Sequence, residues 1–279
     1  MLVTSKEMFE KAREGGYAIP APNFIDLESL HWHVETAEKL NVPLILPLAE
    51  AHIGENITLE DAALVGKKYA AAAKVPVALH LDHGTDPEII KKAVDLGFTS
   101  VMIDASMESF EENVRRTKEI IAYAHARGAV VEAEIGHVGA GENYENHDES
   151  DSQYTTVEEA RRFVEETGVD SLAISIGTAH GMYKGIPEIN FDRLKEIAAA
   201  IDTPLVLHGG SSSGDENLKK CAVNGISKIN IFSDLLAAAM KALEEAPPKT
   251  YLDVKALSKK GMQDCLEHYY SVFETKPID

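Results

Sequence analysis

The sequence predicts an α/β fold, a (β/α)8 barrel, and three observations lead to this prediction. Short apolar runs alternate eight times with longer amphipathic segments. The runs are almost continuously apolar, which is typical of parallel strands that are buried on both faces. The 279 residues of the chain are close to the roughly 250 of such a barrel. A doubly wound open sheet is the alternative, but no Gly-x-Gly-x-x-Gly follows the first run.

The predicted strands, in chain order, are residues 17–23, 42–48, 75–81, 100–104, 129–134, 170–176, 204–208 and 226–231. Helical patterns lie between and after them, at 27–40, 58–73, 86–97, 108–127, 156–167, 190–201, 214–223 and 234–245. Asp86 is a helix N-cap followed by Pro87 at the first helical position. Thr156 begins a capping box that Glu159 completes. These signals support strand–helix units rather than hairpins.

Two stretches depart from the alternation. Residues 136–155 are polar, contain glycine and show no period, and a loop of about 20 residues in a compact domain is usually functional or disordered. After the eighth unit, Pro247 and Pro248 end a helix, and 252–273 has the pattern of an amphipathic terminal helix. We expect one barrel domain over residues 1–279, with 246–279 as a C-terminal helical extension.

Composition narrows the classes of partner. Lys and Arg number 27 against 46 Asp and Glu, so the net charge is −19, which disfavours nucleic acid and anionic membranes as partners. No apolar run approaches the ~20 residues that span a bilayer. The first residues lack the apolar core of a signal peptide. Cys221 and Cys265 lie in separate helical patterns, so we expect no disulfide and a reducing, cytoplasmic location.

Polar residues gather where the predicted strands end, which is where barrel enzymes place their sites. Three histidines at such ends, His83, His180 and His208, are candidate ligands of a catalytic zinc with an open position for substrate. A single histidine there would more often be a hydrogen-bonded core residue, and the set of three favours a metal. His80 precedes His83 by three residues, so we expect it on the opposite strand face in a structural or supporting role.

Carboxylates and glycines accompany the histidines. Asp82 is a candidate acid or base, or a residue that orients a ligand histidine. Asp104 and Glu134 could equally bind a second cation or hold the ligand histidines in place. Small residues after the sixth and seventh strands suit a phosphate, although plain turn chemistry also explains them: Gly181, Gly209, Gly210 and Ser211, with Lys184 as an added charge.

With these residues assembled, about residues 1–245 resemble the class II, zinc-dependent ketose-bisphosphate aldolases, which include the fructose- and tagatose-bisphosphate enzymes. The segments that carry the resemblance are HLDHG (80–84), MIDAS (102–106), VEAEIGHVGAGE (131–142), SLAISIGTAHG (171–181), LVLHGGSS (206–213) and KIN (228–230). The resemblance implies a (β/α)8 TIM barrel that cleaves a phosphorylated ketose reversibly to glycerone phosphate and an aldehyde through a zinc-stabilised enediolate. It also implies a homodimer or homotetramer.

The resemblance assigns roles to individual residues. Zn²⁺ would bind His83, His180 and His208, with a second metal position near Asp104 and Glu134. Asp82 would exchange a proton with the C4 oxygen, and Glu142 would remove the C3 proton of glycerone phosphate. A monovalent cation, Na⁺ or K⁺, often assists substrate binding in the family. The substrate-binding set would be Asn23, Gly181, Lys184, Gly209, Gly210, Ser211, Asn230, Ile231, Phe232 and Ser233.

Departures from the family pattern fall on the aldehyde side. Phe232 stands where the family generally carries Asp or Ala, and the second strand continues into Glu50 and His52 instead of Ser or Thr. Residues 251–262 contain no arginine for a second phosphate, although Lys255, Lys259 or Lys260 could substitute. We therefore expect a different aldehyde half.

Two other functions remain open, a zinc-dependent barrel hydrolase and a non-catalytic sugar-phosphate binding protein. In the terminal helix, Tyr269, Tyr270 and Phe273 could form an oligomer contact or pack on their own barrel.

Overall fold

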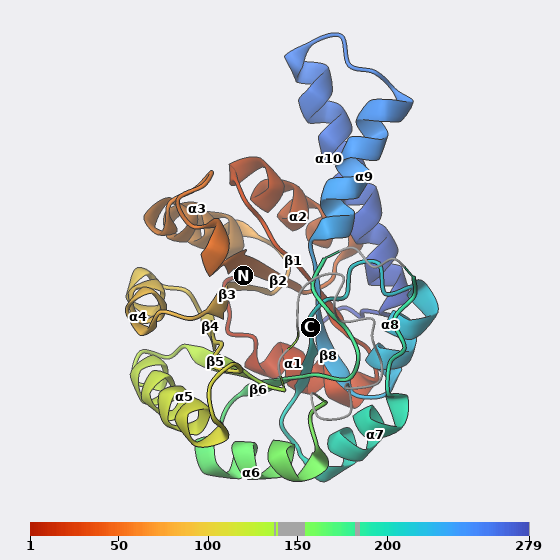
Figure 1. The fold of residues 1–279 in the computed structure, drawn as a ribbon. Helices are drawn as coiled ribbons and strands as arrows, with labels where there is room; N and C mark the ends of the chain where they lie inside the picture. The colour runs from red at the N-terminus through yellow and green to blue at the C-terminus, as the bar shows by residue number, and fades with distance from the viewer. Residues whose placement is uncertain (137, 139–153, 182–184, 279) are drawn as a thin grey trace.

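The computed structural model forms a barrel of eight parallel strands and describes residues 1–136, 138, 154–181 and 185–278 (Figure 1). Hydrogen bonds join the strands in the order β1-β8-β7-β6-β5-β4-β3-β2. Between β1 and β2, the amide of Phe24 donates to the carbonyl of Pro47 over 3.0 Å. The strands are β1 (Ile19–Pro22), β2 (Leu44–Ala49), β3 (Val77–Gly84), β4 (Ser100–Ile103), β5 (Val130–Ile135), β6 (Ser171–Ile174), β7 (Leu205–Leu207) and β8 (Ile226–Ile231). The (β/α)8 TIM barrel is therefore confirmed over the open doubly wound sheet.

Helices surround the strands, and each of the eight predicted helices is present within a few residues of its expected bounds. The 3₁₀ turn η1 (Glu50–His52) follows β2. The helices are α1 (Lys6–Gly15), α2 (Leu27–Leu40), α3 (Leu59–Ala72), α4 (Pro87–Leu96), α5 (Phe110–His125), α6 (Val157–Thr167), α7 (Phe191–Ala200), α8 (Asp215–Val223), α9 (Ser233–Glu245) and α10 (Tyr251–Val272). The side chains of Asp86 and Thr156 accept hydrogen bonds from the first turns of α4 and α6, as their N-cap positions predict.

Alternation along the strands sorts side chains between two environments. Leu79 and Leu81 of β3 face outward and join the main apolar cluster between the sheet and its helices. Ala78 faces inward, where it packs in a separate cluster with Met8 and Phe9 of α1. This second cluster closes the barrel interior near the amino ends of the strands, so the polar inward-facing residues lie between it and the opposite, open end.

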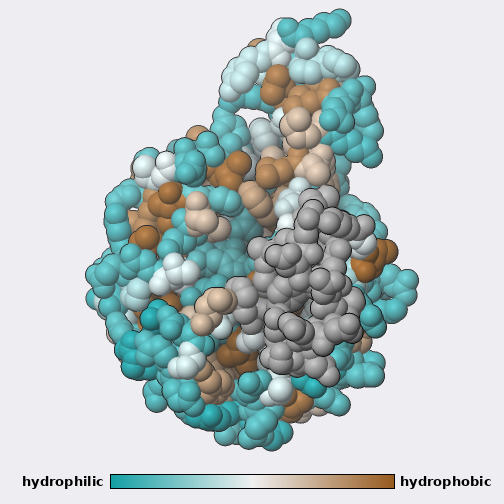
Figure 2. All heavy atoms as spheres, viewed as in Figure 1, coloured by the Kyte–Doolittle hydropathy of each residue, from teal (hydrophilic) through white to brown (hydrophobic). Residues whose placement is uncertain are grey.

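The C-terminal helices α9 and α10 form an arm that stands clear of the barrel (Figures 1 and 2). The carboxyl end of α10 returns to the barrel, where Tyr269, Tyr270 and Phe273 are buried. The Tyr270 hydroxyl donates to the carbonyl of Pro43 over 3.0 Å. These three aromatic residues therefore pack on their own barrel, the second of their two predicted roles. Among the described residues, no helix is long and apolar enough to cross a membrane.

The inner apolar cluster provides a test of the fold. Phe9 is 2% exposed at the closed end of the barrel. Phe9→Ala should lower the free energy of unfolding by about 3–5 kcal/mol, because it removes a buried ring and the neighbouring residues relax only partly into the cavity. Leu64→Ala, on the exposed face of α3 at 66% exposure, is the matched control and should change it by less than about 0.5 kcal/mol. Urea denaturation measures both, and equal effects would contradict the assignment of Phe9 to the core.

Candidate active site and metal centre

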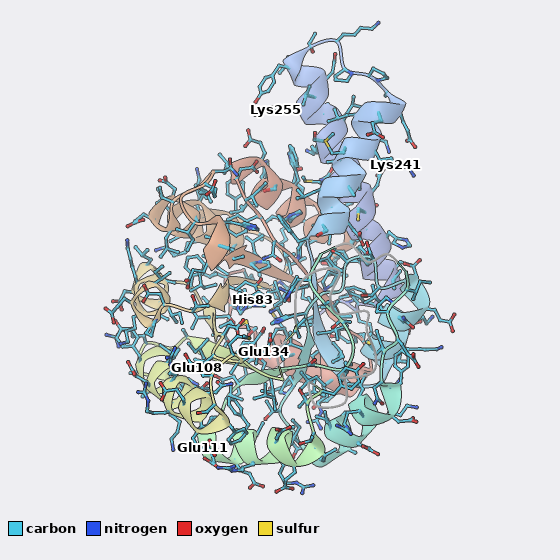
Figure 3. All side chains as sticks on the ribbon, in the orientation of Figure 1. His83, Glu108, Glu111, Glu134, Lys241 and Lys255 are labelled. Carbon is cyan, nitrogen blue, oxygen red and sulfur yellow. The ribbon has the colours of Figure 1, made fainter. Side chains whose placement is uncertain are left out.

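A cavity of about 440 Å³ opens at the carboxyl ends of the strands. In Figure 3, His83 and Glu134 lie near the centre of the barrel, whereas Lys241 and Lys255 lie on the arm. Among the described residues that line the cavity, none is lysine or arginine. The lining residues are Asn23, Ala49, Ala51, His52, Asp82, His83, Asp104, Val138, His180, Gly181, Gly209, Gly210, Ser211, Asn230, Phe232 and Ser233. Most of the predicted substrate-binding set therefore meets at one opening.

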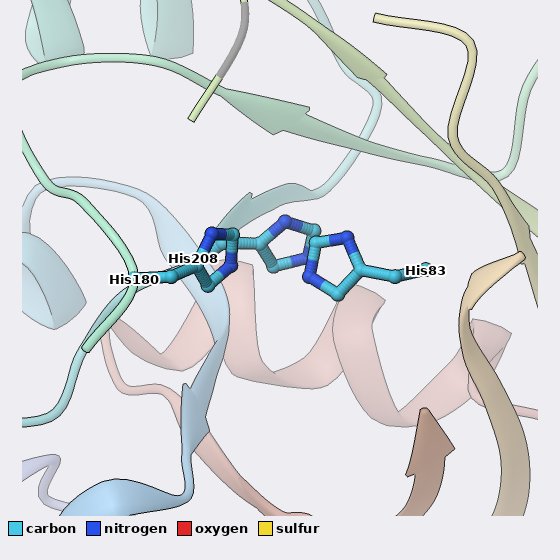
Figure 4. Close-up of side chains that lie close together, drawn as sticks. All are labelled: His83, His180 and His208. Atoms are coloured by element: carbon cyan, nitrogen blue, oxygen red, sulfur yellow. The ribbon is translucent and has the colours of Figure 1, made fainter. Parts of the chain in front are cut away.

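The three predicted metal ligands converge (Figure 4). The ring centre of His83 lies 4.8 Å from that of His180 and 4.4 Å from that of His208. Each ring offers one nitrogen within 4.8 Å of the others. The Nδ1 atom of His180 lies 3.2 Å from the carbonyl of Val138 and can donate to it, which leaves Nε2 buried without a hydrogen-bond partner. A buried unpartnered nitrogen beside two further imidazoles fits a zinc ion.

The backbone of β3 explains how two consecutive residues, Asp82 and His83, both line the cavity. Strict alternation would place them on opposite faces. His83 has a φ of 49°, in the left-handed region that residues other than glycine seldom adopt. The pairing of β3 with β4 also shifts register between Leu81 and Gly84. The chain therefore turns at His83 and brings its ring into the barrel mouth.

The prediction that His80 points to the opposite face from His83 is wrong for the same reason. His80 faces into the barrel below Asp82, with its Nε2 3.7 Å from Oδ1 of Asp82. Its Nδ1 lies 2.8 Å from the hydroxyl of Ser100. The predicted supporting role fits this position, because His80 touches residues of the site without lining the cavity.

Asp104 and Glu134 each contact one of the three predicted metal ligands in this structure. Oδ2 of Asp104 lies 3.0 Å from Nδ1 of His83, and Oε2 of Glu134 lies 2.7 Å from Nδ1 of His208. The Asp104 contact is a carboxylate–histidine pair of the kind that orients ligands in metal sites, because it leaves Nε2 of His83 available. His208 instead has a carboxylate at each ring nitrogen, Glu134 at Nδ1 and Glu132 at Nε2. The same carboxylates and His83 also offer ligand atoms within 4.8 Å of one another, so the geometry accommodates either predicted role.

The histidines differ in protonation because their neighbours differ. Burial lowers the pKa of His180 to about 4, with the nearby His83 and His208 adding to the effect. Burial alone would also lower the pKa of His208, but hydrogen bonds to Glu132 and Glu134 outweigh it and raise the pKa to about 10. The two carboxylates beside His208 therefore favour its protonated form, whereas His180 has no such hydrogen-bonded partner among the described residues.

Asp82 is held as an ionised hydrogen-bond acceptor. Nδ2 of Asn23 donates to its Oδ2 over 2.9 Å, and Nδ2 of Asn230 donates to both of its oxygens over 3.0 Å. Burial would raise the pKa of Asp82, but His83, His80 and Lys228 together lower it well below its usual value. The carboxylate is thus ionised and fixed at the cavity wall.

Sequence reasoning missed a layer of buried residues beneath the cavity, Glu132 and Lys228. The Lys228 ammonium contacts both oxygens of Glu132, over 2.8 and 2.9 Å, and both side chains are 0% exposed. Strand alternation carried the necessary signal, because Glu132 is two residues before Glu134 and Lys228 is two before Asn230. Each pair therefore shares the inward face of its strand.

The glycines of the β7 loop are required by backbone packing as well as by any ligand. A Cβ on Gly209 would lie 2.3 Å from the carbonyl oxygen of Ala179, and one on Gly210 would lie 2.7 Å from that of Asn230. At Gly181 the φ of 103° alone favours glycine, because a Cβ there would meet no neighbouring atom within 4 Å. Close backbone packing thus explains Gly209 and Gly210, and the positive φ explains Gly181, while all three line the cavity.

The residues predicted on the aldehyde side, and Ile231, do not all line the cavity. His52 and Phe232 line the cavity and stack with ring centres 4.8 Å apart. Glu50 instead accepts a hydrogen bond from the amide of Thr85, which holds the β3–α4 connection. The Ile231 side chain packs in the outer apolar cluster, so only its backbone can serve a substrate.

The predicted lysine substitutes do not reach the cavity within this chain, because Lys255, Lys259 and Lys260 pair with carboxylates outside it. Glu142 and Lys184 lie outside the described residues.

Comparisons with known proteins agree with this geometry. Residues 3–277 match the family model of class-II fructose-bisphosphate aldolases. The chain is similar to the YdjI aldolase from Escherichia coli K12, with 35% identity and a TM-score of 0.89 over 99% of this chain and 98% of that one. It is also similar to a fructose-1,6-bisphosphate aldolase candidate from Coccidioides immitis, with 32% identity and a TM-score of 0.84 over 96% and 95% of the two chains.

A fructose-bisphosphate aldolase from Campylobacter jejuni shares the fold, with 23% identity and a TM-score of 0.82 over 98% of this chain and 95% of that one. The family match covers almost the whole chain and includes the strand ends that carry the converging histidines. The chain therefore belongs to the class-II fructose-bisphosphate aldolase family and is an aldolase, a carbon–carbon lyase.

Proposed function

We propose that the protein catalyses metal-dependent, reversible cleavage of a ketose 1-phosphate or 1,6-bisphosphate to glycerone phosphate and an aldehyde. The observation that carries the proposal is the unpartnered Nε2 of His180, which faces two further imidazoles in the cavity that also holds Asp82. A metal-dependent aldol cleavage needs a site that binds a metal ion and a fixed carboxylate that transfers a proton, and the three histidines and Asp82 meet these two needs.

The metal in this proposal is Zn²⁺ on His83, His180 and His208. When bound, it supplies a Lewis acid that stabilises negative charge on the substrate oxygens during cleavage. A second cation near Asp104 and Glu134 and a monovalent cation, Na⁺ or K⁺, near the phosphate belong to the proposal as additional sites. The charge on the nearby carboxylates supports the first of these.

In this proposal Asp82 and Glu142 each carry out one of the two proton transfers. In the cleavage direction Asp82 accepts the proton of the C4 hydroxyl, the C3–C4 bond breaks, and its electron pair remains on the glycerone phosphate half. Glu142 then returns a proton to C3. The amides of Asn23 and Asn230 keep the Asp82 carboxylate in place, and the unpartnered Oδ1 of Asn230 can accept a hydrogen bond from a substrate hydroxyl.

The phosphate of glycerone phosphate binds in the proposal at the β6–β8 side of the cavity. Gly181, Gly209, Gly210 and Ser211 line this side, and α9 begins there at Ser233. Backbone amides and a helix N-terminus attract an anion without a basic side chain. Lys184 adds a positive charge from the loop after β6.

The aldehyde half of the substrate lies against Ala49, Ala51, His52 and Phe232 in this proposal. The described part of this wall carries no lysine or arginine, so it suits an aldehyde without a phosphate better than one with a phosphate. We further propose a cytoplasmic location and a homodimer or homotetramer, which the membership of the aldolase family supports.

Metal binding is the first testable consequence. At a hundredfold excess over its dissociation constant, Zn²⁺ should stabilise the protein by about 2.7 kcal/mol, because it binds only the folded chain. His180→Ala should abolish this gain and the aldolase activity, as should a chelator. His268→Ala, at an exposed histidine of α10, is the control and should leave both unchanged. Thermal unfolding with and without metal measures the gain, and a metal-independent wild type would contradict the site.

Substitutions of Glu142 and of Asp82 should impair different steps of the reaction. Glu142→Ala should abolish exchange of the C3 proton of glycerone phosphate with solvent deuterium, because it removes the base. Asp82→Asn should retain that exchange while kcat for cleavage falls by about 10²–10⁴-fold. NMR follows the exchange and a coupled assay follows the cleavage. A hydrolase would be indifferent to Glu142→Ala, and a binding protein would show neither reaction.

Substrate preference tests the aldehyde half. We expect kcat/KM for fructose 1,6-bisphosphate to be at least about tenfold lower than for the best ketose 1-phosphate, since a phosphate without a cationic partner forgoes about 1.5–3 kcal/mol. Phe232→Ala enlarges this half without adding charge and should change the ranking of the unphosphorylated aldehydes only. Turnover of fructose 1,6-bisphosphate near the diffusional limit would contradict the proposal.

A further inference from the structure

The fully buried ion pair between Lys228 of β8 and Glu132 of β5 lies directly beneath the three histidines. The Lys228 ammonium donates to both Glu132 oxygens, over 2.8 and 2.9 Å, and lies 3.3 Å from Nε2 of His80. His80 is itself held by the hydroxyl of Ser100. Lys228 and His80 therefore both lie beside the Glu132 carboxylate, and neither of them lines the cavity.

Glu132 also contacts His208, one of the three proposed metal ligands. Its Oε1 lies 3.0 Å from Nε2 of His208, a ring that is 0% exposed. A carboxylate bound by an ammonium can only accept at this contact, so Nε2 of His208 must carry the hydrogen. The other ring nitrogen, Nδ1, lies 2.7 Å from Glu134 at the mouth of the barrel.

The two carboxylates around His208 differ in what holds them. Glu132 is locked by Lys228, whereas Glu134 has no lysine or arginine within ion-pair distance among the described residues. Glu134 also accepts a hydrogen bond from the amide of Val138, over 2.9 Å. Of the two nitrogens of His208, Nδ1 is therefore the one that can exchange its partner.

We propose that Glu132, oriented by Lys228, is a positioning residue that keeps the hydrogen of His208 on Nε2 and so presents Nδ1 to the metal. The inference rests on the proposed metal site at His83, His180 and His208. It adds two residues of the barrel interior that line no part of the cavity and act on the metal through the ring of His208.

The test replaces the ion pair as a unit, because Lys228→Met alone leaves a buried carboxylate without its cation and is expected to impair folding. The double variant E132Q/K228M keeps an amide oxygen that can accept from Nε2 of His208. The double variant E132M/K228M offers no acceptor at similar volume. An exposed pair of α8 provides the matched controls, E216Q/K220M and E216M/K220M. Competition with a chelator measures Co²⁺ affinity, and the visible spectrum of bound Co²⁺ reports the ligand geometry.

We expect E132M/K228M to bind Co²⁺ about 10–100-fold more weakly than the wild type, with an altered spectrum. E132Q/K228M should retain the wild-type spectrum and most of the affinity, and both controls should match the wild type. Wild-type affinity and spectrum in E132M/K228M would overturn the proposal. Equal losses in the two Glu132 variants would overturn it as well, because the accepting oxygen would then be irrelevant.

Histidine ¹⁵N spectra of the wild-type protein loaded with Zn²⁺ test the same point without relying on the folding of any variant. The proposal requires a protonated Nε2 and a metal-bound Nδ1 at His208, and the reverse assignment overturns it. Because affinity and spectra are read without substrate, a wild type that binds metal but fails to cleave ketoses would contradict only the proposed function. A wild type that binds no metal would overturn both.

Discussion

The concentration of buried carboxylates inside the barrel is the constraint on which the site depends. Asp82, Glu132 and Glu134 are at most 2% exposed, and burying such anions is costly unless cations or hydrogen-bond donors surround them. In the described part of the chain, Lys228 is the only buried lysine or arginine. One lysine cannot balance three carboxylates, so amides and imidazoles must supply the other contacts. The excess negative charge at the mouth is what makes a divalent cation favourable there.

This constraint orders the barrel interior into layers. Apolar side chains of α1 close the amino end, the Lys228–Glu132 pair lies above them, and Asp82 with the three converging histidines forms the mouth. Each layer supports the next, because Glu132 contacts His208 while Lys228 lies 3.7 Å from Oδ1 of Asp82. A change in the middle layer should therefore alter the metal site and the proposed proton acceptor together.

The overall charge of −19 and an anionic substrate are compatible because attraction in this cavity is local. Backbone amides near Gly181, Gly209 and Gly210, a helix N-terminus and the proposed cation act over a few ångströms, whereas salt screens the more distant surface charge. The wall formed by His52 and Phe232 offers no comparable attraction. The two halves of the cavity therefore differ in polarity, which is the physical basis for expecting a different aldehyde.

The sequence by itself determined the alternation of strands and helices, and with it the barrel and the edge at which His83, His180 and His208 meet, because these depend on local periodicity and on the fixed geometry of parallel strands. It could not determine that His83 turns into the mouth, since that requires a backbone φ of 49° and a register shift against β4. Nor could it pair Lys228 with Glu132, which lie 96 residues apart. Only the closed barrel decides which inward-facing side chains meet, because closure sets the distances across its interior.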